Sequence, residues 1–417
     1  MKKLEYIFTV IIFIGLTGAS AESVLVKFGK PRNLDKSTQI YGRTGVLAVD
    51  QVLEQLQAEA VPLFHHSDSH LDRWFCVSVP RDSLLEQALR SLSEISDLVY
   101  VGKNRVFRLH SDPIPNDTRI SEQWALQKIG AFQAWAIDSG NADVPVAVID
   151  TGVDYDHPDL QPNIWINPGE DLNGNAAFDS SDLNGIDDDA NGFIDDIQGW
   201  DFTDAPNYPD GGDYLNRDND PNDEYGHGTG VAGIVSAVSN NRTGISGLAP
   251  HCRIMNLRAF TGNGYGEEDD VASAVLYAVE NGARIINMSF GDVFVSRVLD
   301  DIIEYGRQQQ IIMVASAGNS STREIHYPSG FNSTISVGST NENDQLSGFS
   351  NYGSTIDLVA PGSNILSTTI NNDYRYWNGT SFSAPHVSAA AALLLSQEPE
   401  LSAESVRGIL VNSTDLI

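Results

Sequence analysis

Cysteine and long apolar segments are both scarce in this sequence of 417 residues. The two cysteines, Cys76 and Cys252, fall in segments that we expect processing to separate, so no disulfide is expected in the mature protein. The apolar stretch at the N-terminus, Tyr6 to Gly18, has 13 residues. A membrane-spanning helix needs about 20, and no other stretch is long and apolar enough. The sequence also lacks internal repeats.

Basic residues are few, with 25 Lys and Arg against 56 Asp and Glu and a net charge of −31. Residues 22–110 carry 11 of each sign, whereas residues 111–417 carry 12 basic and 44 acidic residues. The excess acid therefore lies entirely in the C-terminal three quarters. Such a surface repels phosphates, so we expect no nucleic-acid partner. It suits bound metal cations, although a solvated acidic face is the alternative for most of these carboxylates.

The N-terminus has the pattern of a secretory signal peptide. Lys2 and Lys3 precede the apolar stretch, and Ala19-Ser20-Ala21 is a small-residue cleavage signal. A membrane anchor is the alternative, which the short apolar stretch disfavours. We predict cleavage after Ala21, with residues 1–21 as signal peptide, secretion to the extracellular medium and no membrane association afterwards.

Residues 22–112 are predicted to form a small α+β module. Val24 to Phe28 and Trp74 to Val79 alternate as strands do, and Asp97 to Val101 reads as a third strand. Leu84, Leu85, Ala88, Leu89 and Leu92 give residues 83–95 the period of a helix. The polar stretch from Ser111 to Arg119 is typical of a linker.

Residues 113–417 are predicted to form an α/β domain. Continuous apolar runs alternate with helical patterns, which indicates a mostly parallel sheet covered on both faces. The predicted strands are 144–149, 285–288 and 311–315, and the predicted helices are 227–239, 268–281 and 383–396. Residues 167–225 break the pattern, with 17 acidic residues against the single Arg217. We interpret them as a long surface insertion.

Three short stretches carry the chemistry of a nucleophilic serine. Asp150 ends a buried strand, His227 opens a helix in Gly226-His227-Gly228-Thr229, and Ser381 opens another in Gly379-Thr380-Ser381. A serine hydroxyl needs an adjacent base to react, a neutral imidazole can take its proton, and a carboxylate orients the imidazole. Taken alone, each residue has a purely structural alternative. Asp150 could be an acid in a turn after a strand, His227 a partner of a helix N-cap, and Ser381 an N-cap serine.

Together and in this order, the three stretches resemble the subtilisin-like serine proteases, the subtilases, over about residues 117–415. The resemblance implies a three-layer subtilisin-like fold with Asp150, His227 and Ser381 as catalytic triad. It also implies that Asn319, after the strand ending in Ala315-Ser316-Ala317-Gly318, donates its amide to the oxyanion together with the backbone N–H of Ser381.

The resemblance further assigns residues that contact the substrate. Ser289, Phe290 and Gly291 would pair with the peptide backbone as an added strand. Ser316, Ala317 and Gly318 would line the primary specificity pocket. His326 would fall near the base of that pocket, with a surface-loop histidine as the alternative.

Two calcium sites are predicted. The loop from Asn240 to Ile245 resembles the calcium loop of the subtilases, with six oxygen ligands. These are the carbonyls of Ser239, Thr243 and Ile245 and the side chains of Asp117, Asp159 and Asn241. In the insertion, Asp187, Asp189, Asn191 and Asp195 follow the front half of an EF-hand loop, but Gln198 stands where its last ligand, a glutamate, is expected.

The whole chain is therefore predicted to be a secreted, calcium-dependent serine endopeptidase that acts on protein or peptide substrates. Residues 22–112 resemble the ferredoxin-like propeptide of the family, which implies an intramolecular inhibitor cut near residues 108–116. A stable accessory domain is the alternative. The chain ends at Ile417 just past the family's last helix, and a missing C-terminal extension would allow a cell-surface location. Rival hypotheses are a catalytically silent calcium-binding scaffold and a processing protease of narrow specificity.

Overall fold

The computed structural model describes residues 23–30, 42–64, 71, 73–80, 84–104 and 114–415. The predicted signal peptide, the first three residues of the predicted linker, and most of the predicted cleavage region (residues 108–116) lie outside these residues. The chain forms two compact units, Met1–Leu109 and His110–Ile417, which are described separately. In the described ranges, no helix has both the length and the apolar character that crossing a membrane requires.

The first unit is an antiparallel sheet with two helices. Its sheet order is β2-β3-β1-β4, and its β-α-β-β-α-β chain order is that of the ferredoxin-like motif. Val24, Val26 and Phe28 point inward from alternate positions of β1 and pack with Leu53 and Leu92 of the helices. The elements are β1 (Ser23–Phe28), α1 (Leu47–Gln55), β2 (Glu59–Pro62), β3 (Trp74–Ser78), α2 (Leu85–Ser93) and β4 (Leu98–Lys103).

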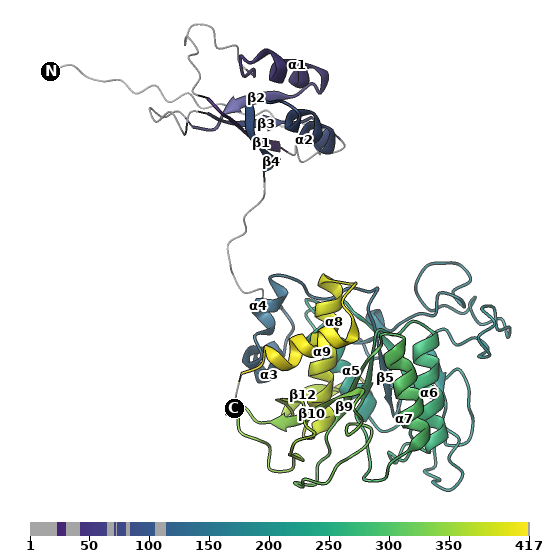
Figure 1. Ribbon diagram of the computed structural model, residues 1–417. Coiled ribbons are helices and arrows are strands. Elements are labelled where there is room, and N and C mark those ends of the chain that lie inside the picture. The colour runs from purple at the N-terminus through teal and green to yellow at the C-terminus, as the bar shows by residue number, and fades with distance from the viewer. Residues whose placement is uncertain are drawn as a thin grey trace. The chain divides into compact units, whose positions relative to one another are not determined.

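The second unit is built on a seven-stranded sheet whose neighbouring strands are all parallel (Figure 1). The order is β11-β10-β9-β8-β5-β7-β6. The strands are β5 (Pro145–Asp150), β6 (Gly199–Asp201), β7 (Arg253–Arg258), β8 (Ile285–Met288), β9 (Ile312–Ser316), β10 (Thr334–Thr340) and β11 (Leu358–Pro361). The expected parallel α/β fold is confirmed.

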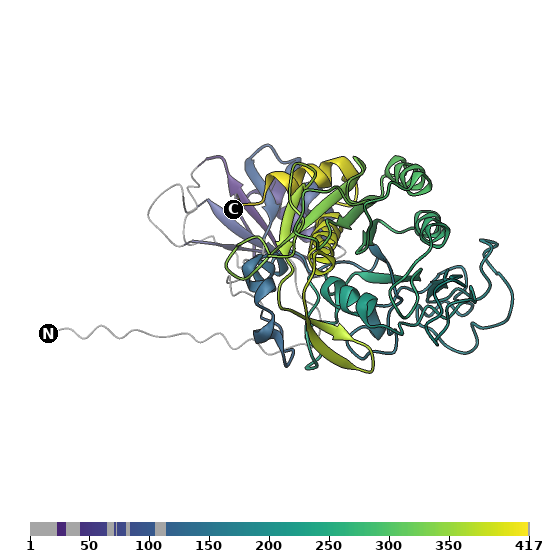
Figure 2. The same cartoon turned by 90° about the horizontal axis from the view of Figure 1, so that it is seen from below.

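Helices cover both faces of this sheet. Val146 and Val148 of β5 pack against the core under α5 and α8, while Ala147 and Ile149 pack against the core under α6 and α7. Figure 2 shows α6 and α7 on the side of the sheet away from α5. Because both faces are covered, the strands are apolar at consecutive positions. The main helices are α5 (His227–Ser236), α6 (Glu268–Glu280), α7 (Arg297–Gln308) and α8 (Ala384–Gln397).

Shorter elements complete the second unit. A hairpin of β12 and β13 packs beside α5, and α9 packs on α8. The remaining elements are η2 (Ile120–Glu122), α3 (Trp124–Lys128), α4 (Ala131–Trp135), η3 (Gln161–Asn163), β12 (Ile365–Thr369), β13 (Asp373–Trp377), η4 (Thr380–Phe382) and α9 (Ala403–Asn412).

The acidic insertion is more than a surface loop, which corrects the sequence interpretation of residues 167–225. Its segment β6 pairs with β7 as the edge strand of the central sheet. Phe202 is 1% exposed and packs edge-on against Phe193 and Tyr277. These few apolar residues are scattered among many acids, so the segment lacks the continuous run by which the other strands are found.

The order of the strands places the site. β5 lies between β7 and β8, so the chain runs outward from β5 in both directions, and the carboxyl ends of these strands share one edge. Asp150 ends β5, and Ser289 follows β8 at that edge. Open parallel sheets bind their ligands outside the carboxyl ends of the strands at such a switch point.

Candidate active site

Asp150 and His227 form a hydrogen-bonded pair. His227 Nδ1 lies 2.7 Å from Asp150 Oδ1. Asp150 is 3% exposed, and the backbone N–H of Thr151 donates to the same oxygen at 2.8 Å. Because the carboxylate can only accept, Nδ1 carries the hydrogen in this pair. The other ring nitrogen, Nε2, is then left as an acceptor for a proton.

The surroundings of His227 set its basicity. Burial lowers the pKa of the imidazole, but the charge of Asp150 and the hydrogen bond to it outweigh burial and, with the charge of Asp223, raise the pKa above its ordinary value. A base with such a pKa takes a proton readily near neutral pH.

Ser381 lies in η4, just before α8, and not within the helix that the sequence predicted to open with it. Its Oγ donates to the carbonyl of Ser289 at 3.0 Å, and the Ser289 hydroxyl donates back to the carbonyl of Ser381 at 2.8 Å. Among the described residues no hydrogen bond joins Ser381 to His227. The ring of His227 lies 5.2 Å from that of Phe382, the next residue along. The hydroxyl must therefore turn away from Ser289 to reach the imidazole.

Asn319 is held in one orientation by Thr380. Its Oδ1 accepts from the backbone N–H of Thr380 at 2.8 Å and from the Thr380 hydroxyl at 2.9 Å. Because a backbone N–H can only donate, the atom that faces it is the oxygen of the amide. The Nδ2 group is thereby free to donate, and it lies near Gly379. A Cβ atom built on Gly379 would lie 3.4 Å from Asn319 Nδ2. The structure thus brings the predicted oxyanion donor next to Ser381.

The predicted substrate-contact residues line two places on the same edge. Ser289, Phe290 and Gly291 line a cavity together with Asp150 and His227. Ser316, Ala317 and Gly318 leave the end of β9, where Asn351 Nδ2 donates to the carbonyl of Ala317 at 2.9 Å. An added Cβ on Gly318 would lie 2.6 Å from His326 Nδ1. His326 therefore lies against the predicted pocket loop.

Most of the chain is similar to known proteins. The family model described as "Subtilase family" matches residues 141–416. A thermophilic serine proteinase of Bacillus sp. (strain AK1) is 35% identical over 75% of this chain and 67% of that protein. Thermitase of Thermoactinomyces vulgaris is 35% identical over 73% of this chain and 92% of that protein.

This chain belongs to the subtilase family. It is a serine endopeptidase. A solved protease of Pseudoalteromonas arctica PAMC 21717 superposes with a TM-score of 0.61 at 28% identity and covers 73% of this chain and 93% of that one. A halolysin-like extracellular serine protease of Natrialba magadii is 33% identical over 77% of this chain and 52% of that protein.

Asp223 is a site residue of this subtilase that sequence reasoning missed. It is 5% exposed, and its Oδ1 accepts from Thr151 Oγ1, Tyr225 N and Gly226 N, each at 2.8 Å. Its Oδ2 accepts from Thr229 N at 2.9 Å and Thr229 Oγ1 at 2.6 Å. Asp223 thus joins the end of β5 to the first turn of α5, which begins with His227. It is one acid among many in its segment, so no local signal distinguishes it.

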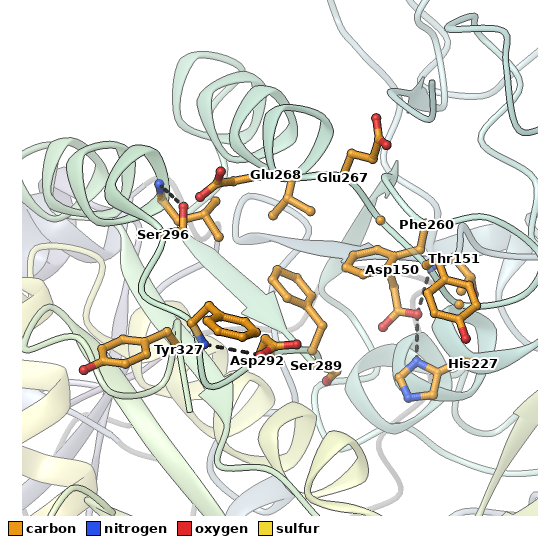
Figure 3. A pocket seen from close by; sticks show the side chains of 18 of the residues that line it. Asp150, Thr151, His227, Phe260, Glu267, Glu268, Ser289, Asp292, Ser296 and Tyr327 are labelled. Atoms are coloured by element: carbon orange, nitrogen blue, oxygen red, sulfur yellow. Dashed lines mark hydrogen bonds and ion pairs between the residues drawn. The ribbon is translucent and has the colours of Figure 1, made fainter. Parts of the chain in front are cut away.

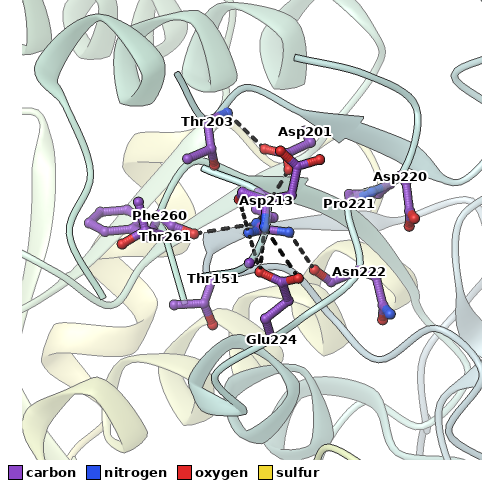
Figure 4. A network of polar contacts seen from close by, with 12 residues as sticks. Thr151, Asp201, Thr203, Asp213, Asp220, Pro221, Asn222, Glu224, Phe260 and Thr261 are labelled. Atoms are coloured by element: carbon purple, nitrogen blue, oxygen red, sulfur yellow. Dashed lines mark hydrogen bonds and ion pairs between the residues drawn. The ribbon is translucent and has the colours of Figure 1, made fainter. Parts of the chain in front are cut away.

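Arg258 ties the acidic insertion to the sheet beside the site. The side chain is 2% exposed, and its Nη2 contacts Glu224 Oε2 at 2.9 Å while its Nε lies 3.3 Å from Asp201 Oδ2. It also donates to the backbone carbonyls of Asn222 and Asp213. Figure 4 shows Asp201 and Glu224 on different sides of this network. A buried guanidinium with this many acceptors holds the loop that carries the neighbouring Asp223.

Residues of the first predicted calcium site of the subtilase are hydrogen-bonded to the loop from Asn240 to Ile245. Asp117 Oδ2 accepts from Asn240 N at 2.9 Å, and Asp159, fully buried, accepts from Asn241 Nδ2 at 2.6 Å and Ile245 N at 2.9 Å. Burial raises the pKa of Asp159. Thr243 N donates to Asn241 Oδ1 at 2.7 Å, within the loop that starts after Ser239. Asp117 and Asp159 therefore both contact this loop, while Asn241 presents its NH₂ group to Asp159 and its oxygen to Thr243 N.

The second site differs from the sequence prediction. Carboxylate oxygens of Asp187, Asp189 and Glu170 all lie within 4.8 Å of one another. Asn191 lies beside them, and its backbone N–H donates to Asp187 and Asp189 at 3.0 Å. Asp195 does not join the cluster, because it accepts from Asn184 N at 2.9 Å in a neighbouring turn.

Glu170 is the ligand candidate that sequence spacing could not find. It is fully buried, and among the described residues its Oε2 has no hydrogen-bond partner. Burial raises the pKa of Glu170 above its ordinary value. Hydrogen bonds from the backbone N–H groups of Asp188 and Asp189 lower the pKa, but by less than burial raises it. A buried carboxylate beside two others fits the oxygen donors that calcium takes.

Proposed function

We propose that this subtilase is a secreted, calcium-dependent endopeptidase, made as a zymogen, in which Ser381 forms an acyl-enzyme. The observation that carries the proposal is the Asp150–His227 hydrogen bond of 2.7 Å beside Ser381. The orientation of Asn319 by Thr380 supports it.

In the proposed reaction, the Ser381 hydroxyl turns from Ser289 to His227 and attacks the carbonyl carbon of the peptide bond. His227 Nε2 takes the hydroxyl proton, and Asp150 stabilises the imidazolium that forms. The C–N bond then breaks, and His227 gives its proton to the leaving amine. Water attacks the acyl-enzyme in the second half, again with His227 as base, and releases the acid and the free Ser381 hydroxyl.

The oxyanion of each tetrahedral intermediate would be held by two donors. Asn319 Nδ2 is the first, because Thr380 occupies the oxygen of the same amide. The backbone N–H of Ser381 is the second. Donors fixed in this way need no reorganisation when charge develops, which is the source of their large effect on rate.

Calcium would hold the loops that carry these groups. Asp117, Asp159 and Asn241, with carbonyls of residues 239, 243 and 245, would hold one ion. Asp187, Asp189 and Glu170 would hold a second in the segment between Asp150 and His227. When bound, the ion neutralises carboxylates that otherwise repel one another.

The first unit would act as an intramolecular inhibitor until it is cut from the catalytic domain. Its own antiparallel sheet and core support a part that folds as a unit. The extracellular protease of Natrialba magadii among the relatives supports secretion. N-terminal sequencing of the protein from culture medium tests both, because cleavage after Ala21 alone would contradict the zymogen.

A fluorophosphonate probe tests the nucleophile. We expect covalent labelling of the processed wild type, located on Ser381 by mass spectrometry, and no labelling of Ser381→Ala. Absence of labelling in both would favour the catalytically silent scaffold. A peptide library then separates a broad endopeptidase from a processing protease of narrow specificity.

A further inference from the structure

A cavity of about 760 Å³ opens beside the catalytic pair. Asp150 and His227 form one end of it, and Ser289 to Gly291 run along it. The loop between β7 and α6, residues 260–268, and the segment 292–299 form the rest. Ser316 to Gly318 are not among its lining residues, so it is separate from the predicted primary pocket.

The walls of the cavity combine aromatic and apolar side chains with polar ones. Phe260 and Phe290 contact each other with ring centroids 4.9 Å apart. Val271 and Leu299 are buried behind them, and Phe294, which is 80% exposed, stands at the opening. A long side chain of a substrate could therefore lay an aliphatic stem against these rings.

Three carboxylates besides Asp150 line the same cavity. The carboxylates of Glu267 and Glu268 have no hydrogen bond or ion pair in the part of the chain that the structure describes. Asp292 Oδ1 accepts from Val293 N at 2.6 Å, which leaves Oδ2 free. Figure 3 shows Glu268 directed toward Ser296 above Asp292. The lining includes no lysine or arginine to neutralise them.

We propose that this cavity selects peptide substrates with a lysine or arginine at one position, other than the residue immediately before the scissile bond. The inference rests on the proposed function, because it requires a peptide lying along Ser289 to Gly291. The substrate cation would meet carboxylates that have no cation of their own, over aromatic faces that also attract cations. The ligand class is thus a basic peptide, not an apolar one.

The expected preference is moderate because the carboxylates are near the surface. One exposed ion pair changes an equilibrium by about 1.4- to 5-fold, so two pairs together give about 2- to 30-fold. We expect a lysine at the selected position to raise kcat/KM by about tenfold over acetyl-lysine, which has the same stem without the charge. The preference should decline at high salt.

The test uses quenched fluorescent peptides in which lysine and acetyl-lysine are compared at each position around one cleaved bond. We expect one position with a clear advantage for lysine in the processed wild type. The double variant Glu267→Gln/Glu268→Gln should lose most of that advantage and still cleave the acetyl-lysine peptides. Glu280→Gln, at the far end of α6, is the matched control and should keep the advantage.

Two results would overturn the inference. One is equal kcat/KM for lysine and acetyl-lysine at every position, in a protein that cleaves the peptides. The other is equal loss in the double variant and in two charge-removing variants far from the cavity, which would attribute the preference to the overall negative charge. A protein that neither cleaves any peptide nor reacts with the fluorophosphonate probe would instead refute the proposed function.

Discussion

Replacing Asp223 by asparagine tests whether this buried carboxylate holds the catalytic pair. The substitution keeps the size of the side chain and changes one oxygen into an NH₂ group. In the wild type, Oδ1 accepts from Thr151, Tyr225 and Gly226 and Oδ2 accepts from Thr229. In Asp223→Asn the new amide faces the backbone N–H of Thr229, so two donors meet.

The cost follows from these contacts. The Thr229 hydroxyl can turn and accept from the new amide, but the Thr229 N–H is left buried and unpaired, at about 1–3 kcal/mol. The bonds that remain lose the charge of their acceptor, which makes them weaker. We expect a total loss of about 3 kcal/mol in the free energy of unfolding. For a domain of this size that lowers Tm by about 2 °C per kcal/mol, or ~6 °C.

Activity should fall as well, because Asp223 connects Thr151, next to Asp150, with the turn that begins at His227. A displacement of about 1 Å in a catalytic group costs up to ~100-fold in rate. Thermal unfolding would be measured in a Ser381→Ala background with calcium present, so that self-digestion does not interfere. The kcat/KM would be measured on the corresponding processed enzyme with active Ser381.

Asp220→Asn is the matched control, since this acid lies in the same segment, is exposed, and has a hydrogen bond from Tyr155 OH at 2.7 Å. It should change the free energy of unfolding by less than about 1 kcal/mol. If Asp220→Asn and Asp223→Asn lower Tm equally, or if neither does, the structural role assigned to Asp223 is wrong.

Three further predictions concern the site. Asn319→Ala should lower kcat by about 10²–10³ with little change in Tm, because it removes one oxyanion donor; an unchanged kcat in steady-state assays would exclude that role. The kcat/KM should fall as the pH falls through the pKa of His227, since only the neutral imidazole accepts a proton, with a midpoint above the ordinary ~6.5. NMR titration should show a lower pKa for His227 in Asp150→Asn, and an unshifted value would contradict the pairing. Removing calcium by chelation should lower Tm by the equivalent of about 2.7 kcal/mol if the ion was at 100 times its Kd. Glu170→Gln should reduce that calcium-dependent shift more than Asp171→Asn does, and equal shifts in the two variants would count against Glu170 as a ligand.

The class of fold and the proposed chemistry were both readable from the sequence. Strand β8 occupies Ile285–Met288 as predicted, and α5, α6 and α8 lie within three residues of their expected ends. Burial on both faces of a parallel sheet demands apolar residues at consecutive positions, and this leaves a local pattern. The proposed catalytic residues could be named from the sequence because each lies in a short motif at a strand end or helix start.

Which of the many acids are buried and hydrogen-bonded is visible only in the folded structure. Asp223, Glu170 and Asp201 are buried and contact Thr151, Asp188 and Arg258 respectively, while exposed acids such as Asp220 have the same local sequence character. The membership of β6 in the sheet was also not readable, because three residues with few apolar neighbours give no period. Whether a carboxylate is solvated, paired or gathered with others depends on long-range contacts, and these have no signature in local composition.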